Sequence, residues 1–138
     1  APEQRPLNVY IDNNYEVARC PSDLGDPNAE YGHVFTEVGN SYQVQFRWEA
    51  YAVSPVTDNN INTVSSVHDW DEPSKKIVLG DWVWHGNRRI SEAQTRWHDP
   101  SKRRFNILFA DGSAKFFSFP LAHETMGATS PDPARGFY

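Results

Sequence analysis

Residues 105–119 read FNILFADGSAKFFSF, and this stretch decides the fold. Asp111 and Gly112 separate two runs of β-forming residues, and an Asp-Gly pair tolerates the positive φ angles of a two-residue hairpin loop. Pairing outward from that loop places Ile107 opposite Phe116. One face of the hairpin is therefore expected to form core, and its members are Phe105, Ile107, Phe109, Ala114 and Phe116. The other face is half apolar, which predicts partial cover by another element; it carries Asn106, Leu108, Lys115 and Phe117.

Alternation of apolar and polar residues extends the sheet beyond the hairpin. Residues 42–52 place apolar side chains on one parity and polar side chains on the other, which predicts a strand with one buried and one solvated face. Residues 77–84 predict an apolar strand with a bulge at Gly80 and Asp81. Residues 7–12 also alternate and predict a short strand.

The remaining segments connect these strands. Polar, turn-rich residues predict loops over 20–32 and 54–74. Ser91 begins two predicted helical turns over 91–97, and residues 126–138 lack periodicity and predict a surface tail. The expected fold is therefore α+β, mainly β: one domain over residues 1–138, built on an antiparallel sheet of three to five strands with long polar loops.

Composition excludes several classes of function. The chain has 138 residues, a formal net charge of -5 and a pI near 5.4, whereas nucleic-acid binders are usually basic. The basic cluster at 102–104 therefore predicts a solvated turn rather than a nucleic-acid surface. No apolar run reaches the length of a membrane span. A single cysteine, Cys20, rules out an internal disulfide.

Nucleophilic and transition-metal chemistry have no motif in this sequence. Cys20 lies in a turn-like Cys-Pro-Ser-Asp context, where a small packing residue is expected and a reactive thiol is the alternative. Five histidines are dispersed without the spacing of a Cys-x-x-Cys or His-Glu-x-x-His site. No paired carboxylates or nucleophile–base spacing stand out either, so the chain is not expected to be an enzyme.

The sequence gives more support to a calcium-binding loop. Asp26, Asn28 and Glu30 offer oxygen ligands at alternate positions, and Glu37 is the twelfth residue counted from Asp26, as in a twelve-residue calcium loop. Tyr31 occupies the sixth position, where such loops need glycine. A solvated acidic loop is the alternative interpretation.

Tryptophans in or near predicted loops suggest a carbohydrate site. Trp70, Trp82 and Trp84 are the candidates, because a flat indole surface stacks on sugar rings. Trp82 and Trp84 also share a parity in the predicted strand over 77–84, which favours packing against a sheet face.

Several separated motifs follow one another in the order of a known family. They are CPSD at 20–23, SY at 41–42, IVLGDW at 77–82, WH at 97–98 and NILFADGS at 106–113. Together they resemble the C-terminal globular region of the prepilin-like, pseudopilin-related proteins abundant in planctomycetes, over residues 18–119. That family has a histidine followed by nine residues and then Asp-Gly. Here twelve residues separate His98 from Asp111, with the insertion expected within 99–104.

The resemblance implies a non-catalytic structural role as the head of a pilin-like subunit, outside the cytoplasmic membrane, in a filament or a type II secretion-related complex. Its partners would be other pilin-like subunits or secretion-apparatus proteins, with membrane contact only through an apolar N-terminal helix that these residues do not include. The residues implied to be structural are His98, Asp111, Gly112, Cys20 and Asp23. Asp111 and Gly112 would make the turn, and His98 would hydrogen-bond near it. No cofactor is implied, although such heads often use calcium to order a loop. The alternative function is a carbohydrate-binding β module.

Overall fold

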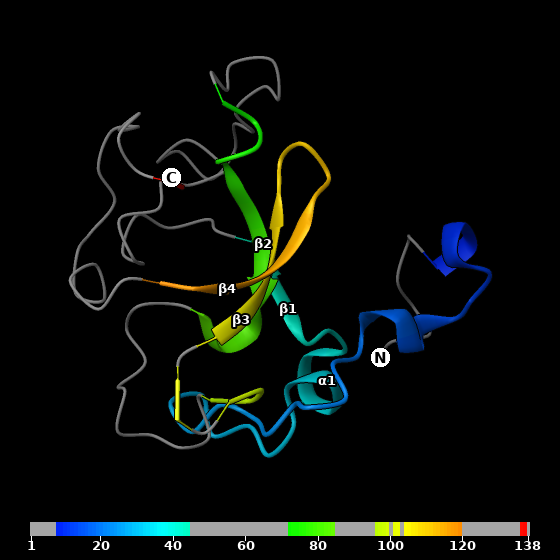
Figure 1. The fold of residues 1–138 in the computed structure, drawn as a ribbon. Coiled ribbons are helices and arrows are strands. Elements are labelled where there is room, and N and C mark those ends of the chain that lie inside the picture. Colours follow the sequence, from blue (N-terminus) through cyan, green and yellow to red (C-terminus); the bar gives the residue numbers. More distant parts are fainter. Residues whose placement is uncertain are drawn as a thin grey trace, which may run out of the picture.

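A four-stranded antiparallel sheet organises the protein (Figure 1). The computed structural model describes residues 8–44, 72–84, 96–99, 101–102, 104–119 and 136–137. The strands lie in chain order as β1 (Tyr42–Val44), β2 (Ile77–Asp81), β3 (Arg104–Phe109) and β4 (Ala114–Ser118). A short helix, α1 (Val34–Val38), precedes β1. The predicted α+β, mainly β fold with an antiparallel sheet is confirmed.

The β3–β4 hairpin forms where the sequence predicts it, but its loop is one residue longer than expected. The amide of Phe109 bonds Ser113 O at 2.8 Å and the amide of Gly112 bonds Phe109 O at 3.0 Å. Gly112 has φ 83°, so a three-residue loop closes with glycine in the left-handed region. Phe116 consequently pairs with Asn106 instead of Ile107.

The shifted register exchanges the two faces of β4, because side chains alternate along a strand. Phe105, Ile107 and Phe109 of β3 are buried, as expected. Phe117, rather than Phe116, shares their face and contacts the ring of Phe109. The placement of Ala114 and Phe116 in the core was therefore wrong: Ala114 is exposed, and Phe116 is 50% exposed on the opposite face.

The core is largely aromatic and lies against the face of the sheet that carries Phe105, Ile107 and Phe109, here called the first face. Trp84 is fully buried and stacks on Phe119, with ring centroids 5.7 Å apart. Phe137 is only 3% exposed and meets Phe117 and Phe119 edge-on. At least this residue of the predicted surface tail over 126–138 therefore lies in the core. Lys76 is also buried, and burial lowers the pKa of its ammonium to about 8.

Two predictions about the strands are corrected at β2. Strand β2 ends at Asp81, and Trp82–Trp84 continues as a 3-10 turn, η5, so Trp82 and Trp84 do not share a strand. The irregularity lies between Ile77 and Leu79 rather than at Gly80 and Asp81. A Cβ on Gly80 would lie 2.5 Å from Ile107 Cδ1, so close packing against β3 explains that glycine. The strand predicted over 42–52 is present at β1, but its predicted faces are wrong there: Val44 is 42% exposed, whereas Ser41 of the polar parity is buried. The rest of the predicted strand lies outside the described residues.

The bulge in β2 places an apolar side chain on the opposite, second face of the sheet. Ile77 pairs with Phe109 of the core face, yet Leu79, two residues later, pairs with Leu108 of the other face. An apolar row thus crosses all four strands on the second face, consisting of Val44, Leu79, Leu108 and Ala114. Leu79 and Leu108 are half-buried, whereas Ala114 is exposed and Val44 is 42% exposed. The two ends of this apolar row, Val44 and Ala114, thus remain exposed.

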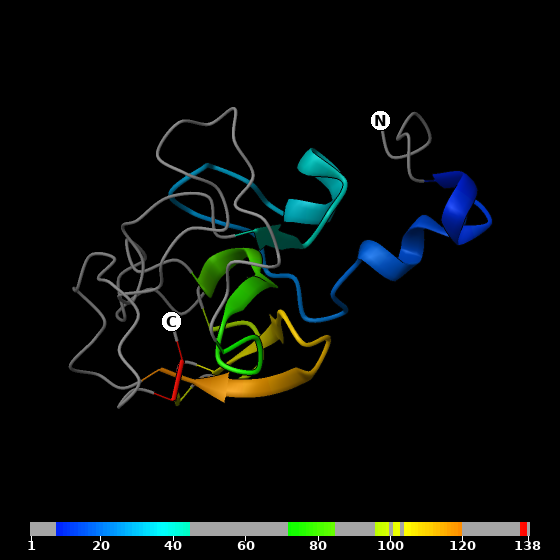
Figure 2. The ribbon, with the colours of Figure 1, turned by 90° about the horizontal axis from the view of Figure 1, so that it is seen from above.

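The N-terminal part of the described chain forms an arm of two 3-10 turns, η2 (Asn8–Ile11) and η3 (Tyr15–Ala18). The strand predicted over 7–12 was wrong, because Asp12 and Asn13 adopt positive φ and the amide of Asn13 closes onto Asn8 O. The arm projects from the body in both ribbon views (Figures 1 and 2). Its apolar side chains are exposed, at 74% for Val9, 82% for Tyr10 and 58% for Val17.

The connecting segments agree with their polar composition where they are described. Residues 20–32 form turns closed by a bridge between Asp26 and Tyr31, as predicted for a loop. The loop predicted over 54–74 is described only at its end, and the helix predicted over 91–97 lies outside the described residues except for Arg96 and Trp97, which are not helical. Among the described residues, no helix has the length and apolar character needed to cross a bilayer.

Candidate functional site: a buried Cys–Asp–His cluster

Three chemically distinct side chains converge beside the second face of the sheet. Cys20 follows the arm, Asp81 ends β2, and His98 precedes β3. His98 Nε2 lies 3.1 Å from Asp81 Oδ2 and 3.6 Å from Cys20 Sγ, and all three potential ligand atoms lie within 4.8 Å of one another. Within the described part of the chain, no other group of three or more His, Cys, Asp or Glu side chains is gathered in this way.

Strand β3 and strand β4 hold this cluster in place. The backbone amide of Asn106 donates to Asp81 Oδ2 at 2.6 Å, and the side-chain Nδ2 of Asn106 donates to Asp81 Oδ1 at 3.4 Å. This Nδ2 also lies 3.0 Å from His98 Nε2. Phe116 meets the imidazole edge-on at a centroid distance of 5.6 Å. The corrected register is what makes this possible, because it places Asn106 and Phe116 side by side on the face that carries Asp81.

Burial and mutual attraction determine the charges in the cluster. Cys20 is 1% exposed and Asp81 is fully buried, whereas the His98 side chain is 15% exposed. The hydrogen bond to Asp81, followed by the contact with Cys20, raises the pKa of His98 to about 10 against the opposing effect of burial. Burial raises the pKa of Tyr42, with the nearby Cys20 and Asp81 adding to the effect. Imidazolium paired with Asp81 carboxylate is therefore the form expected at neutral pH.

The geometry differs from that of a catalytic relay. In a nucleophile–base–acid relay, the nucleophile and the orienting carboxylate contact opposite nitrogens of the imidazole. Here the thiol and the carboxylate both approach Nε2, which carries at most one proton. The arrangement suits an internal ion pair, or the binding of one ion by all three side chains.

The carboxylate of Asp23 anchors the neighbouring loop through four hydrogen bonds. Its Oδ1 accepts from the amides of Gly25 and Val34, and its Oδ2 accepts from the amide of Phe35 and the hydroxyl of Ser41. Burial opposes ionisation of Asp23, but these four hydrogen bonds outweigh it and lower its pKa. The carboxylate thus joins α1, β1 and the CPSD segment.

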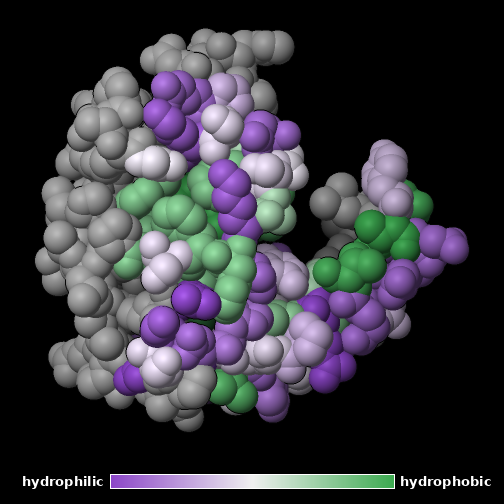
Figure 3. All heavy atoms as spheres, viewed as in Figure 1, coloured by the Kyte–Doolittle hydropathy of each residue, from purple (hydrophilic) through white to green (hydrophobic). Residues whose placement is uncertain are grey.

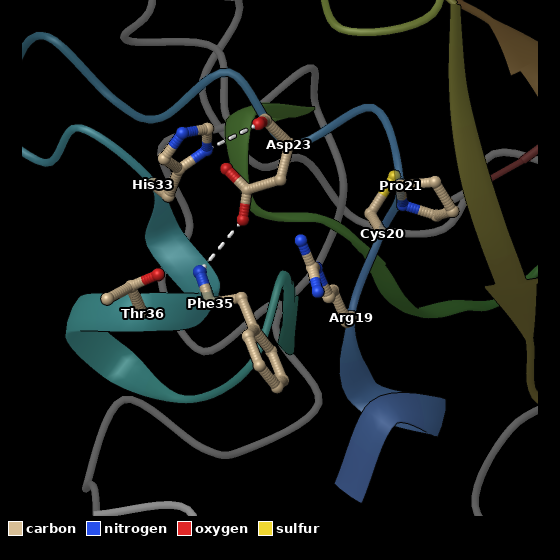
Figure 4. Close-up of a pocket in the computed structure, with 7 residues that line it drawn as sticks. All are labelled: Arg19, Cys20, Pro21, Asp23, His33, Phe35 and Thr36. Carbon is tan, nitrogen blue, oxygen red and sulfur yellow. Dashed lines mark hydrogen bonds between the residues drawn. The ribbon is translucent and has the colours of Figure 1, made fainter.

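A pocket of about 110 Å³ opens over this loop, between the CPSD segment and α1 (Figure 4). The close-up shows the Asp23 carboxylate directed at the amide of Phe35, and its backbone oxygen bonded to His33 Nδ1 at 2.9 Å. Arg19 lies 5.8 Å from the centre of the Phe35 ring. Because both oxygens of Asp23 already accept two hydrogen bonds each, this pocket presents no free carboxylate at its base.

The proposed calcium ligands are not gathered into one site. Asp26 is fully buried, with Oδ1 accepting from the amide of Asn28 and Oδ2 from Trp82 Nε1 at 2.9 Å. Asn28, Glu30 and Glu37 are exposed, and Glu37 lies on α1. The loop is ordered by the tryptophan and by its own backbone instead.

The tryptophans proposed for sugar binding lie in different environments. Trp84 is fully buried in the core, so it cannot form an exposed stacking platform. Trp82 is half-buried, with its ring near Tyr31 and its indole N–H bonded to Asp26. Trp70 lies outside the described residues.

Two of the remaining motif residues lie in the β3–β4 turn, and the third lies in the Cys–Asp–His cluster. Asp111 and Gly112 make the β3–β4 turn as expected, and Asp111 Oδ1 accepts from the amide of Ser113 at 2.9 Å. The expectation that His98 bonds near this turn was wrong, because the side-chain partners of His98 are Cys20, Asp81 and Asn106. Sequence reasoning missed Asp81 and Asn106. A carboxylate inside the apolar run 77–84 was the available signal for Asp81.

Comparison with family models, curated proteins and solved structures gives no match to this chain.

Proposed function

We propose that this chain is the globular head of a pilin-like assembly subunit, held outside the cytoplasmic membrane, with a structural and non-catalytic role. The observation that carries the proposal is the apolar row across the second face of the sheet. One face of the sheet is filled by aromatic core, while the other keeps Val44, Ala114 and Phe116 exposed. Exposed apolar patches on a folded domain usually mark a contact surface.

The occupant in this proposal is the apolar helix that pilin-like subunits place against one face of their sheet. A helix packs its apolar stripe on a sheet face that offers a matching row of aliphatic side chains. The apolar row provides that surface, since Leu79 and Leu108 lie between its exposed ends at Val44 and Ala114.

The N-terminal arm supports the same function independently. Val9 and Val17 of the arm are exposed, and Figure 3 shows green, hydrophobic spheres on the segment that projects from the body. In this proposal the arm contacts neighbouring copies of the chain, because repeated contacts between identical subunits build filaments. The internal bonding of the Cys–Asp–His cluster and the burial of Trp84 add no support for catalysis or sugar stacking.

The coding sequence immediately upstream of Ala1 tests this proposal. We expect a short basic leader, a processing site and about 20 apolar residues, the length of a membrane-crossing helix. An ordinary secretory signal peptide there, or an in-frame start codon near Ala1, would contradict the proposal. The measurement needs only the gene, so it is independent of how the purified chain behaves.

A further inference from the structure

We propose that Cys20, Asp81 and His98 form a binding site for a single divalent transition metal ion of the zinc type. The inference is separate from the assembly role, since it concerns the inside of the head rather than its contact surfaces. It rests on three different donor atoms that lie within 4.8 Å of one another.

The spacing of the three atoms matches a metal coordination sphere. Zinc lies about 2.3 Å from thiolate sulfur, about 2.0–2.1 Å from imidazole nitrogen and about 2.0–2.2 Å from carboxylate oxygen. Tetrahedral angles then separate neighbouring ligand atoms by about 3.3–3.6 Å. The observed separations are 3.1 Å for Nε2–Oδ2 and 3.6 Å for Nε2–Sγ. The third pair, Cys20 Sγ and an Asp81 carboxylate oxygen, lies within 4.8 Å.

The chemistry of the donors selects the class of metal. A sulfur, a nitrogen and a single carboxylate favour zinc, cobalt or similar ions, whereas calcium and magnesium require sites made of oxygen atoms. Metal binding would replace the thiol proton and the Nε2 proton, and both protons would leave to solvent. The doubly charged ion would then balance the thiolate and the buried carboxylate.

The surroundings supply the support that metal ligands require. The backbone amide of Asn106 donates to Asp81 Oδ2, and the Phe116 ring meets the His98 imidazole edge-on. Two of the three ligands are buried, whereas His98 is partly exposed and Asn106 is exposed. An ion would therefore enter from the His98 side, where a water molecule can complete four-coordination.

Cobalt titration of the metal-free chain tests this site. We expect one equivalent of Co²⁺ to produce ligand-field bands of a four-coordinate ion, together with a thiolate-to-cobalt charge-transfer band. Cys20 is the chain's one cysteine, so that second band identifies its ligand without any variant. One equivalent of Zn²⁺ should displace the cobalt and abolish both bands. Absence of the charge-transfer band in the wild-type chain would overturn the proposal.

Variants locate the other ligands. We expect His98→Gln to weaken Co²⁺ binding by more than tenfold, because it removes the imidazole nitrogen from the set of ligands. His33→Gln is the matched control, because His33 bonds Asp23 O and lies outside the cluster. Circular dichroism of the metal-free variants establishes that they are folded. If folded His98→Gln binds Co²⁺ as tightly as the control, the assignment is wrong.

Discussion

Replacing Asp23 by asparagine is expected to lower the free energy of unfolding by roughly 2–4 kcal/mol. The two carboxylate oxygens each accept two hydrogen bonds, and an asparagine side chain has one acceptor oxygen. If the amide nitrogen replaces Oδ2, the hydroxyl of Ser41 can rotate to accept, but the amide of Phe35 is left facing N–H donors. Urea unfolding followed by tryptophan fluorescence measures the loss.

The control for Asp23→Asn is the same substitution at Asp111. Asp111 is exposed and accepts from Ser113 within a turn that asparagine also supports, so a change within about 0.5 kcal/mol is expected. Equal effects at the two positions would contradict the anchoring role of Asp23.

Acid should remove the difference between wild type and Asp23→Asn. The pKa of Asp23 lies below its usual 3.8 in the folded state, so its stabilising effect is present above that value and is lost as pH falls through the folded pKa. The unfolding free energies of the two proteins should therefore converge as pH falls below about 4. A gap that stays constant down to the acid transition would contradict this.

Replacing Gly25 by alanine is expected to lower the free energy of unfolding by roughly 3–5 kcal/mol. Gly25 has φ 84°, and a Cβ there would lie well inside van der Waals contact with the backbone oxygens of Tyr31 and Gly32. Backbone atoms cannot move aside as a flexible side chain does. The Gly25 carbonyl also accepts from Trp97 Nε1 at 3.0 Å, so tryptophan fluorescence should report the displacement.

Gly112→Ala is a closely matched control for Gly25→Ala. Gly112 has nearly the same backbone conformation, at φ 83°, but nothing lies within 4 Å of its added Cβ. It should therefore show only the cost of the left-handed conformation, about 1–2 kcal/mol. If the two variants are equally destabilised, steric contact with the 31–32 backbone is not what requires Gly25.

The strands were predictable from the sequence wherever the signal was local. Alternation around Asp111-Gly112 located the β3–β4 hairpin and identified the buried side of β3. The loop length was not predictable, because an Asp-Gly pair suits both a two-residue loop and a longer loop closed by glycine. That single extra residue moved Phe116 out of the core and beside His98.

The candidate site was much less predictable than the sheet. Cys20 and His98 are 78 positions apart, and Asp81 joins them only because β2 pairs with β3 in the observed register. The bulge between Ile77 and Leu79 also escaped prediction, since an apolar run shows no break in alternation where its faces exchange. The four hydrogen-bond partners of Asp23 were equally out of reach, because three of them lie 11 to 18 positions further along the chain.

Photo-crosslinking in the cells that encode this protein tests the assembly role most directly. Benzoylphenylalanine would replace Tyr10 of the arm or Phe116 beside the apolar row, with the exposed loop residue Lys102 as control position. The proposal predicts adducts at position 10 that contain two copies of this chain, identified by mass spectrometry, and few or none at position 102. At position 116 it predicts a crosslink within one chain, to its own apolar helix. Adducts only with unrelated proteins, or a chain that stays uncrosslinked at both positions, would contradict the proposal that this is a head that assembles with its own copies.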